Sequence, residues 1–348
     1  MEVMDASVYV GDGVLEVQQV AVPDVGRRDV LVEVGQCGIC GTDVHLVLEK
    51  IARPGTVLGH EWAGTIAALG DDVDGWAIGD RVVCGPSPGC GKCRACLAGR
   101  PSVCLDRPLT DHLDFRGAYA RYVAAPAAQL LAVPEALSIR EAALVEPTAV
   151  AMHAVTLSGA TPDDRVLVTG GGPVGLLVTA VLHAQGIHDV TVSEPSPIRR
   201  EHALKVGAAR VVEPHELPRS RMGAPVEEPY QVVFECSGRA DAAESAIDQL
   251  DFAGTCVLVG TGHDLPRINH NRVIVLENTI IGAYNYDAAG FGPALELLAS
   301  GAMPLDALAE PVDISLDQLP EALRRCAAGE LPGKVMVRPV RSEESEQS

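Results

Sequence analysis

The pattern of hydrophobic and polar positions changes along the chain and predicts two kinds of structure. As far as about Ala125, short apolar runs alternate with turns, as in Val30–Val34, Ala63–Leu69 and Arg81–Cys84. Alternation over about four to eight residues is typical of half-buried strands. This part of the chain is therefore predicted to be rich in strands and loops.

A different pattern follows, in which helices and strands alternate. Residues from Leu137 to about Ser158 have a helical pattern, and Arg165–Thr169 is an apolar strand that runs into glycines. Alternation then continues to about Gly282, which predicts a parallel sheet. The remainder contains two helical stretches and a terminal strand, at Gly292–Leu298, Leu319–Ala328 and Lys334–Arg338.

Composition and charge narrow the class of protein. The chain has 348 residues, of which 47% are hydrophobic, enough for two domains. No apolar run approaches the roughly twenty residues of a membrane span, and the N-terminus does not resemble a signal peptide, so we expect a cytoplasmic protein. A formal charge of −20 repels phosphate backbones and argues against a nucleic-acid binder.

Four cysteines within fifteen residues form the most informative local motif: Cys90, Cys93, Cys96 and Cys104. Thiolates at this spacing can surround one tetrahedral zinc ion, and a four-thiolate zinc without an open position is structural. Disulfide pairing is disfavoured by the spacing and by the lack of a secretory signal. An iron–sulfur cluster is disfavoured because the fourth cysteine comes late and is followed by Leu105 instead of proline.

A glycine-rich turn indicates a dinucleotide site. The run Gly170-Gly-Gly172-Pro173-Val174-Gly175 follows a predicted strand and opens a predicted helix. Gly170 permits the tight turn, Gly172 lets backbone amides reach a pyrophosphate, and Gly175 allows close packing of helix and strand.

The choice of cofactor rests on the next strand, Asp189–Ser193. It ends at Glu194, about twenty residues beyond the last glycine, where an acid accepts the ribose hydroxyls of NAD. Glu194 would repel the 2′-phosphate of NADP, although Arg199 and Arg200 lie close enough to permit some use of NADP. Two later strands end in turns whose backbone is expected to line the cofactor, at Ser237 and Gly260.

A second candidate metal site combines a thiolate, an imidazole and a carboxylate from two neighbouring loops. One zinc ion could bind Cys40 and His60 and keep a position open, as a catalytic zinc requires. The third ligand is either Glu61 or Glu146, because a glutamate within an apolar stretch such as 142–147 is rarely unpaired. From these residues alone, a buried thiol and a core histidine remain an alternative.

Together, these segments resemble the zinc-dependent medium-chain dehydrogenase/reductase family from about Val30 to Pro339. The resemblance rests on the segments Gly38–His45 (GICGTDVH), Gly59–Glu61 (GHE) and Gly79–Val82 (GDRV), with the cysteine cluster and the glycine-rich turn. It implies an α/β protein with a GroES-like β-barrel catalytic domain at 1–149 and a Rossmann NAD-binding domain, a doubly wound parallel sheet, at 150–285. Residues 286–348 would return to the catalytic domain and end in an acidic tail.

The resemblance also implies two zinc ions per chain. Cys40, His60 and Glu61 become ligands of a catalytic zinc, with Glu146 a ligand either directly or through water. The four clustered cysteines become the structural site.

A proton relay is implied as well. Thr42 resembles the family's relay hydroxyl, which takes the substrate proton and passes it by way of the nicotinamide ribose to His45 and solvent. A turn cap at Thr42 and an ordinary surface histidine at His45 are the alternatives.

Within the family, Ala143–Pro147 and Ser193–Arg200 look most like the polyol, butanediol and threonine dehydrogenase branch. The implied function is hydride transfer between NAD and a secondary alcohol, diol or polyol, in a homodimer or homotetramer. One alternative is a dehydrogenase of threonine or an aminocyclitol, with a substrate partner among His112, Asp114 and Arg116. A zinc-free quinone or enoyl reductase is disfavoured by the cysteines, and a non-catalytic, zinc-stapled nucleotide-binding protein is the alternative of another class.

Overall fold

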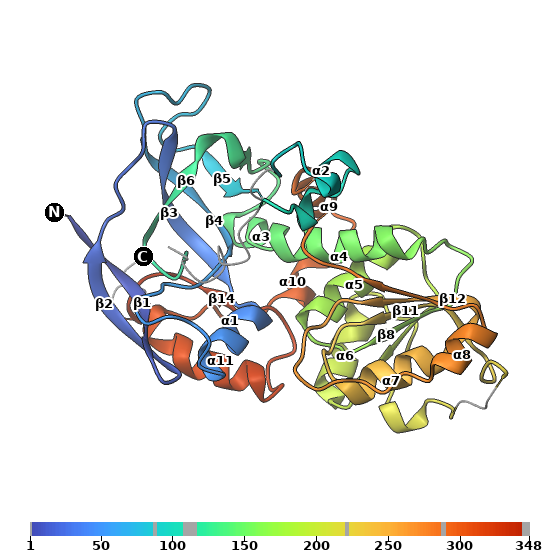
Figure 1. The fold of residues 1–348 in the computed structure, drawn as a ribbon. Helices are drawn as coiled ribbons and strands as arrows, with labels where there is room; N and C mark the ends of the chain where they lie inside the picture. Colours follow the sequence, from blue (N-terminus) through green and yellow to red (C-terminus); the bar gives the residue numbers. More distant parts are fainter. Residues whose placement is uncertain (1, 86–88, 107–116, 220–222, 287–289, 343–348) are drawn as a thin grey trace. The chain divides into compact units, whose positions relative to one another are not determined.

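The chain forms two compact units in the computed structural model, which describes residues 2–85, 89–106, 117–219, 223–286 and 290–342. The first unit comprises Met1–Glu146, Asp287–Ser300 and Ala309–Ser348, and the second comprises Pro147–Tyr286 and Gly301–Leu308 (Figure 1). Among the described residues, no helix combines the length and the apolar character needed to cross a membrane.

Antiparallel strands form the frame of the first unit. One sheet has the strand order β14-β3-β4-β5-β7, with β6 also paired to β3, and β1 and β2 form a separate hairpin. The strands are β1 Val3–Gly11, β2 Val14–Ala21, β3 Asp29–Gly38, β4 Glu61–Leu69, β5 Arg81–Cys84, β6 Tyr122–Pro126, β7 Leu130–Ala132 and β14 Met336–Val337. Alternating buried residues of β3, such as Val30, Val32 and Val34, belong to the core of this unit.

Short helices complete the first unit: α1 Gly41–Leu48, α2 Arg94–Leu97, α3 Ile139–Ala142, α9 Gly292–Ala299 and α11 Leu319–Ala327. Three-residue 3-10 turns lie at Pro101–Val103, Ala127–Gln129 and Leu316–Gln318. The helix α1 corrects the prediction that the segment after Cys40 is a loop. Its start is set by a capping box that hydrophobic periodicity does not reveal, because the Cys40 sulfur accepts from Thr42 N and the Asp43 carboxylate accepts from Cys40 N.

Strand register brings three distant parts of the sequence together. Gly38, at the end of β3, pairs with Glu61 at the start of β4 and with Met336 of β14. The terminal strand is shorter than predicted, but it carries residues next to it, including Lys334, to the point where β3 and β4 meet.

The second unit contains a six-stranded parallel sheet in the order β10-β9-β8-β11-β12-β13. Its strands are β8 Val166–Thr169, β9 Val190–Ser193, β10 Arg210–Val212, β11 Tyr230–Glu235, β12 Leu250–Leu258 and β13 Thr279–Gly282. Its helices are α4 Val145–Ser158, which starts at the end of the first unit, α5 Pro173–Ala184, α6 Pro197–Lys205, α7 Ala240–Asp248, α8 His270–Val275 and α10 Leu305–Leu308, with a 3-10 turn at Pro214–Glu216.

This strand order is that of a doubly wound dinucleotide-binding sheet, in which the order reverses between β8 and β11. All four residues of β8 and of β9 are buried, as expected for strands covered on both faces. The predicted α/β fold class is therefore confirmed. The strand β12 continues through Ala253, with φ +54°, and Gly254, which interrupt its apolar pattern.

Candidate metal centres and cofactor site

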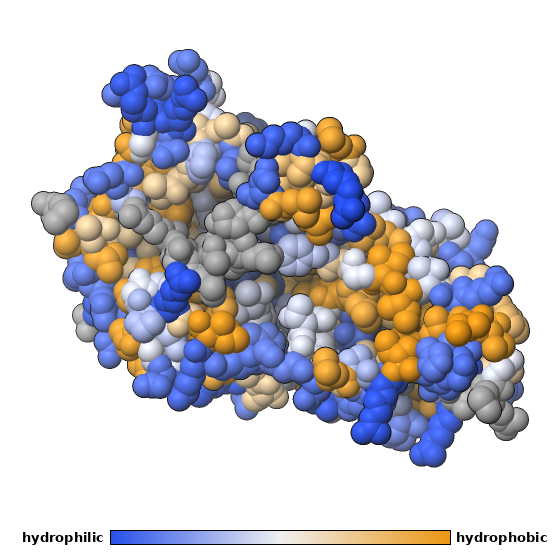
Figure 2. Space-filling model, viewed as in Figure 1, coloured by the Kyte–Doolittle hydropathy of each residue, from blue (hydrophilic) through white to orange (hydrophobic). Residues whose placement is uncertain are grey.

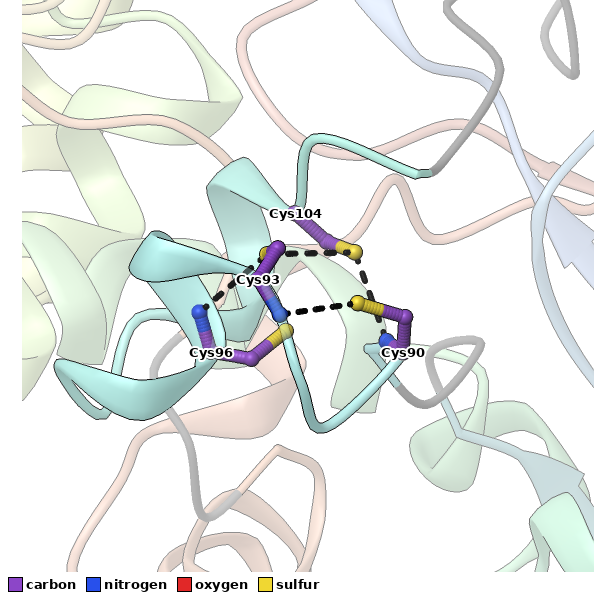
Figure 3. Close-up of side chains that lie close together, drawn as sticks. All are labelled: Cys90, Cys93, Cys96 and Cys104. Carbon is purple, nitrogen blue, oxygen red and sulfur yellow. Dashed lines mark hydrogen bonds between the residues drawn. The ribbon is translucent and has the colours of Figure 1, made fainter.

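The four clustered cysteines lie together on a small lobe of the first unit (Figure 3). All four sulfur atoms fall within 4.8 Å of one another. The Sγ atoms of Cys93 and Cys104 are 3.9 Å apart, far beyond the roughly 2.05 Å of a disulfide bond. Every cysteine in the chain is a free thiol in the structure.

Backbone amides donate to the sulfurs of Cys90, Cys93 and Cys104 and favour the ionised form of Cys93 and Cys104. Burial raises the pKa of Cys96, and the pKa of Cys90 is raised to about 12 although the Lys92 amide lowers it. Cys93 accepts a hydrogen bond from Cys96 N at 3.5 Å, and this bond is the main reason that the pKa of Cys93 is lowered to about 6. Cys104 accepts from Cys90 N at 3.3 Å, which lowers its pKa as well. Thiolates so close together need a cation, and four such donors fit a structural zinc.

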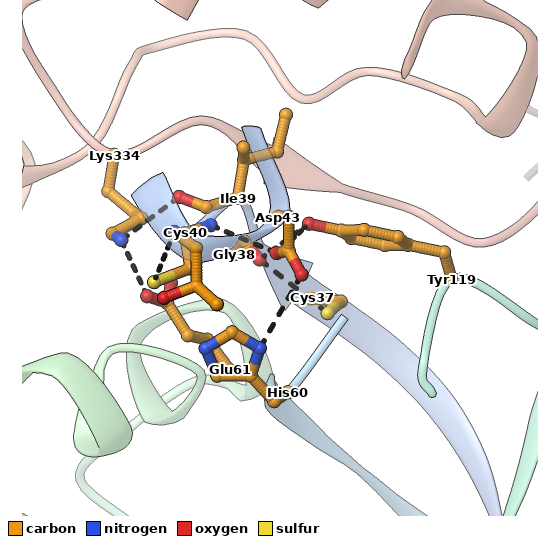
Figure 4. Close-up of polar contacts among 10 residues, drawn as sticks. Cys37, Gly38, Ile39, Cys40, Asp43, His60, Glu61, Tyr119 and Lys334 are labelled. Carbon is orange, nitrogen blue, oxygen red and sulfur yellow. Dashed lines mark hydrogen bonds and ion pairs between the residues drawn. The ribbon is translucent and has the colours of Figure 1, made fainter. Parts of the chain in front are cut away.

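The second metal centre lies where β3 ends and β4 begins (Figure 4). Cys40 is the N-cap of α1, His60 precedes β4, and Glu61 is its first residue. Ligand atoms of all three fall within 4.8 Å of one another, whereas Glu146 is not in this group. One thiolate, one imidazole and one carboxylate form a donor set that fits zinc and leaves a coordination position open.

The surroundings of His60 favour a positive charge. Asp43 Oδ1 lies 3.5 Å from His60 Nδ1. Burial opposes the charged form of the imidazole, but Asp43 and Cys40 raise the pKa of His60 well above its ordinary value. A site that attracts a cation at this point is suited to a metal ion, which would occupy the other ring nitrogen.

Lys334 is a member of this centre that the sequence analysis missed. Its ammonium group donates to Glu61 Oε1 at 2.7 Å and to the Ile39 carbonyl at 3.0 Å. Both charged side chains are almost fully buried, at 2% and 1% exposure. Burial lowers the pKa of Lys334, but the negative charges of Glu61 and Cys40 outweigh this effect and raise the pKa above its usual value.

The same contact selects one oxygen of Glu61 for a metal. Because Lys334 holds Oε1, the other oxygen, Oε2, is buried without a hydrogen-bond partner among the described residues. Gly38 makes room for this arrangement, since a Cβ there would overlap Oε2 and lie 3.2 Å from Lys334 Cδ.

Glu146 lies close to the centre without joining the ligand group. It is in the first turn of α4, and its side chain is buried. Its negative charge contributes to the raised pKa of Lys334, so Lys334 provides positive charge here. Arg140, the nearest basic residue in sequence, is paired with Asp313 instead, at 2.7 Å.

The two relay candidates lie on α1. Thr42 and His45 are three residues apart and therefore on the same side of the helix. Thr42 is exposed, and His45 Nδ1 lies 2.6 Å from Glu49 Oε1. Glu49 is a further residue that the sequence analysis did not predict.

In the second unit, the glycine-rich turn has the expected geometry. Gly170 has φ +96°, Gly172 is the N-cap of α5, and Pro173 is its first residue. A Cβ at Gly175 would overlap the carbonyl oxygen of Gly170. Only glycine therefore allows α5 to begin this close to β8.

Glu194 closes the turn from the neighbouring strand. One carboxylate oxygen accepts from Gly171 N at 2.7 Å and the other from Ser196 N at 2.9 Å. The Arg199 guanidinium lies against Gly172, 3.8 Å from the position of a Cβ there. Arg200 is engaged elsewhere, with the carbonyl oxygen of Glu194 and with the Glu213 carboxylate, both at 2.8 Å.

The turn after β11 meets the glycine-rich turn, and the turn after β12 meets the turn after β11. Ser237 N would lie 2.9 Å from a Cβ at Gly170, and a Cβ at Gly260 would overlap the amide of Gly238. The buried Glu235, which the sequence analysis did not single out, fixes the first of these turns by accepting from Ser237 N at 2.8 Å and from Gly238 N at 3.1 Å. The predicted cofactor residues are thus adjacent at the carboxyl ends of β8, β9, β11 and β12.

Comparison with known proteins agrees with this arrangement. Residues 26–135 match the model of the alcohol dehydrogenase GroES-like domain, and residues 173–300 match that of the zinc-binding dehydrogenases. The chain is 31% identical to a sorbitol dehydrogenase of Bacillus subtilis over 92% of its own length and 93% of the relative's.

The chain belongs to the zinc-dependent medium-chain alcohol dehydrogenase family. An L-threonine 3-dehydrogenase of Pyrococcus horikoshii is 33% identical over 92% of this chain and 94% of that protein. The crystal structure of a zinc-binding dehydrogenase of Sinorhizobium meliloti 1021, bound to NADP, has a TM-score of 0.87 at 31% identity and covers 97% of this chain and 100% of that chain.

Family membership makes the protein a zinc-containing, NAD(P)-dependent dehydrogenase of the polyol and threonine branch. The predicted family, fold class and oxidoreductase character are confirmed. The segment 107–116, with His112, Asp114 and Arg116 as predicted substrate partners, lies outside the described residues.

Proposed function

We propose that the protein oxidises a secondary alcohol of a diol or polyol to a ketone and transfers the hydride to NAD. The grouping of Cys40, His60 and Glu61 carries the proposal, because these three donors fit a zinc ion with an open position. The similarity to sorbitol and threonine dehydrogenases supports a substrate with more than one polar group. In this proposal the NAD-binding domain extends from 150 to 285, and the catalytic domain comprises 1–149 and the segment from 286 onward.

Each residue has a proposed role. When bound, zinc would act as a Lewis acid that lowers the pKa of a hydroxyl towards neutrality. Thr42 would receive the substrate proton and pass it by way of the nicotinamide ribose towards His45, which Glu49 holds at 2.6 Å. Glu146 would contact the metal through water. The backbone amides of Gly172 and Val174 would donate to the pyrophosphate, and Pro173, which has no N–H, would fix the start of α5.

The test is NAD reduction across a panel of diols, polyols, L-threonine, aminocyclitols and simple secondary alcohols, combined with zinc analysis. We expect two zinc ions per chain and the highest kcat/KM with a diol or polyol. A preference for threonine or an aminocyclitol would transfer the assignment to the alternative dehydrogenases. One zinc ion with no turnover would favour a non-catalytic protein, and none would favour a zinc-free reductase.

Glu194 predicts a preference for NAD over NADP. Its carboxylate would accept the ribose hydroxyls and repel a 2′-phosphate, while Arg200 is held by Glu213 and is not available to that phosphate. Glu194→Ala should reduce kcat/KM with NAD by about ten- to a hundredfold, since a hydrogen bond to a charged group contributes about 1.5–3 kcal/mol. Glu194→Gln, which keeps the side-chain length but not the charge, should lower the ratio of kcat/KM with NAD to kcat/KM with NADP. Equal kcat/KM with both cofactors in the unmodified protein would show that Arg199 dominates.

We also propose a homodimer or homotetramer. The strand β13 is an edge of the parallel sheet, with half-buried Ile280 and Ile281. Figure 2 shows apolar surface where β12 and α8 lie. The exposed apolar side chains on β12, on α8 and just after β13 are Phe252, Ile274, Val275 and Tyr284. An edge strand in an apolar surface invites self-association.

Light scattering at micromolar concentration should therefore give a mass of two or four chains. Ile274→Lys should weaken the assembly, because Ile274 is 67% exposed in the isolated chain. Ile78→Lys is the matched control, since Ile78 is 69% exposed but lies in the first unit. A stable monomer would refute the proposal, and equal effects of the two lysines would place the interface elsewhere.

A further inference from the structure

Tyr119 is a fully buried side chain that touches the Cys40/His60 centre in two ways (Figure 4). Its hydroxyl donates to Asp43 Oδ2 at 2.7 Å and lies 3.2 Å from the Gly38 carbonyl oxygen. A hydroxyl has one proton, and the shorter bond to a charged acceptor is the stronger of the two. The proton therefore belongs to the bond with Asp43.

Asp43 connects this hydroxyl to two of the metal-binding residues. It is 1% exposed, it accepts from Cys40 N at 3.2 Å, and its other oxygen faces His60 Nδ1 at 3.5 Å. A carboxylate at Nδ1 fixes the ring so that Nε2 is free to bind a metal. The orientation of the imidazole thus depends on where Asp43 is held.

The ring of Tyr119 reaches the same centre from the backbone side. Gly59, directly before His60, has φ +93°, and a Cβ there would lie 2.9 Å from Tyr119 Cδ1. The aromatic ring therefore packs against the backbone that presents His60. A phenylalanine would keep this packing and remove only the hydroxyl.

We propose that Tyr119 is a positioning residue for the catalytic metal, which acts through Asp43 to hold the imidazole of His60 in its binding orientation. This inference rests on the proposed zinc site at Cys40, His60 and Glu61. Without the hydroxyl, the Asp43 carboxylate keeps the weaker bond from Cys40 N and its 3.5 Å contact with His60, and it can rotate away from Nδ1. The imidazole of His60 is then less often in the orientation that presents Nε2 to a metal, and metal binding weakens.

The test measures Co²⁺ binding to the full-length protein after its Cys40 site has been emptied and while the four-cysteine site stays filled with zinc. The thiolate-to-cobalt absorption band reports the site, and its loss in Cys40→Ser confirms the assignment. Tyr119→Phe should weaken Co²⁺ binding by about three- to tenfold. This is at or below the lower end of the effects seen for residues that hydrogen-bond a metal-binding side chain directly, because Tyr119 acts one contact further away. It should also shift the visible absorption of the bound cobalt.

Tyr9→Phe provides the matched control. Tyr9 is equally buried, and its hydroxyl accepts a hydrogen bond from Gly13 N at 3.1 Å, which is not a member of the centre. Both variants should lower the melting temperature, and only Tyr119→Phe should change Co²⁺ affinity. Unchanged or tighter Co²⁺ binding in Tyr119→Phe would overturn the proposal.

A double-mutant cycle tests the route through Asp43. In an Asp43→Asn background, Tyr119→Phe should have almost no further effect on Co²⁺ affinity, since both changes break the same chain of contacts. Additive effects would show that Tyr119 acts in another way and would also overturn the proposal. Failure of the proposed function has a separate signature, because unmodified protein would then give no thiolate-to-cobalt band that depends on Cys40.

Discussion

Cys40→Ser should lower kcat by at least about a thousandfold while the protein stays folded and binds NAD. The metal at this centre would stabilise developing charge by several kcal/mol, and its loss removes that term from the barrier. Serine is a good N-cap residue, so its hydroxyl can replace the Cys40 sulfur as the acceptor for Thr42 N and keep α1 in place.

Cys93→Ser should fail in a different way. Cys93 caps α2 and contributes one of the four clustered sulfurs, so its loss should release one zinc ion per chain and lower the melting temperature by roughly ten degrees, because the binding energy of a structural zinc is largely folding energy. The Cys93→Ser protein that remains folded should still turn over substrate at the Cys40 centre.

Zinc stoichiometry, melting temperature, NAD binding and kcat, each measured for Cys40→Ser, Cys93→Ser and a control variant, separate these outcomes. Cys326→Ser is the control, since Cys326 belongs to neither cluster, and it should leave all four quantities near their unmodified values. Near-normal kcat in Cys40→Ser would show that the catalytic zinc is misassigned. A Cys93→Ser protein with two zinc ions and an unchanged melting temperature would remove the structural role from the cysteine cluster.

Local sequence patterns predicted much of this molecule. The glycine-rich turn and the cysteine cluster each lie within a short stretch of chain, so their spacing already fixes the geometry that the chemistry needs. The strands Arg81–Cys84 and Val166–Thr169 were visible because apolar runs bounded by turn residues have few alternative structures. The alternation of helix and strand then sufficed for the parallel sheet.

Contacts between distant parts of the chain could not be predicted in this way. Lys334 is 273 residues from Glu61, and Tyr119 is 76 residues from Asp43. Neither side chain stands in a motif, and only the pairing of β14 with β3 places Lys334 in the centre. The sequence offered only the metal as a partner for Glu146, whereas the structure adds the buried ammonium group of Lys334.

Lys334→Met should lower the free energy of unfolding of the protein with an empty Cys40 site by about 3–5 kcal/mol. This is the typical cost of leaving one member of a buried ion pair without its partner. Lys334 and Glu61 are 2% and 1% exposed, so water cannot take over the role of the missing ammonium group. Lys50→Met is the surface control: Lys50 is 59% exposed and lies 3.4 Å from Asp12, a kind of pair that contributes about 0–1 kcal/mol. Denaturant unfolding measures both variants.

Zinc at the Cys40 centre should reduce this penalty. A bound zinc ion supplies positive charge to Glu61, so Lys334→Met should destabilise the zinc-loaded protein less than the protein with an empty Cys40 site. Adding Glu61→Gln to Lys334→Met should restore much of the lost stability of the metal-free form, because the uncompensated charge is then gone. Equal losses with and without zinc at this centre, and no recovery in the double variant, would show that Lys334 contributes through packing alone and that Glu61 is not shared between the ammonium group and the metal.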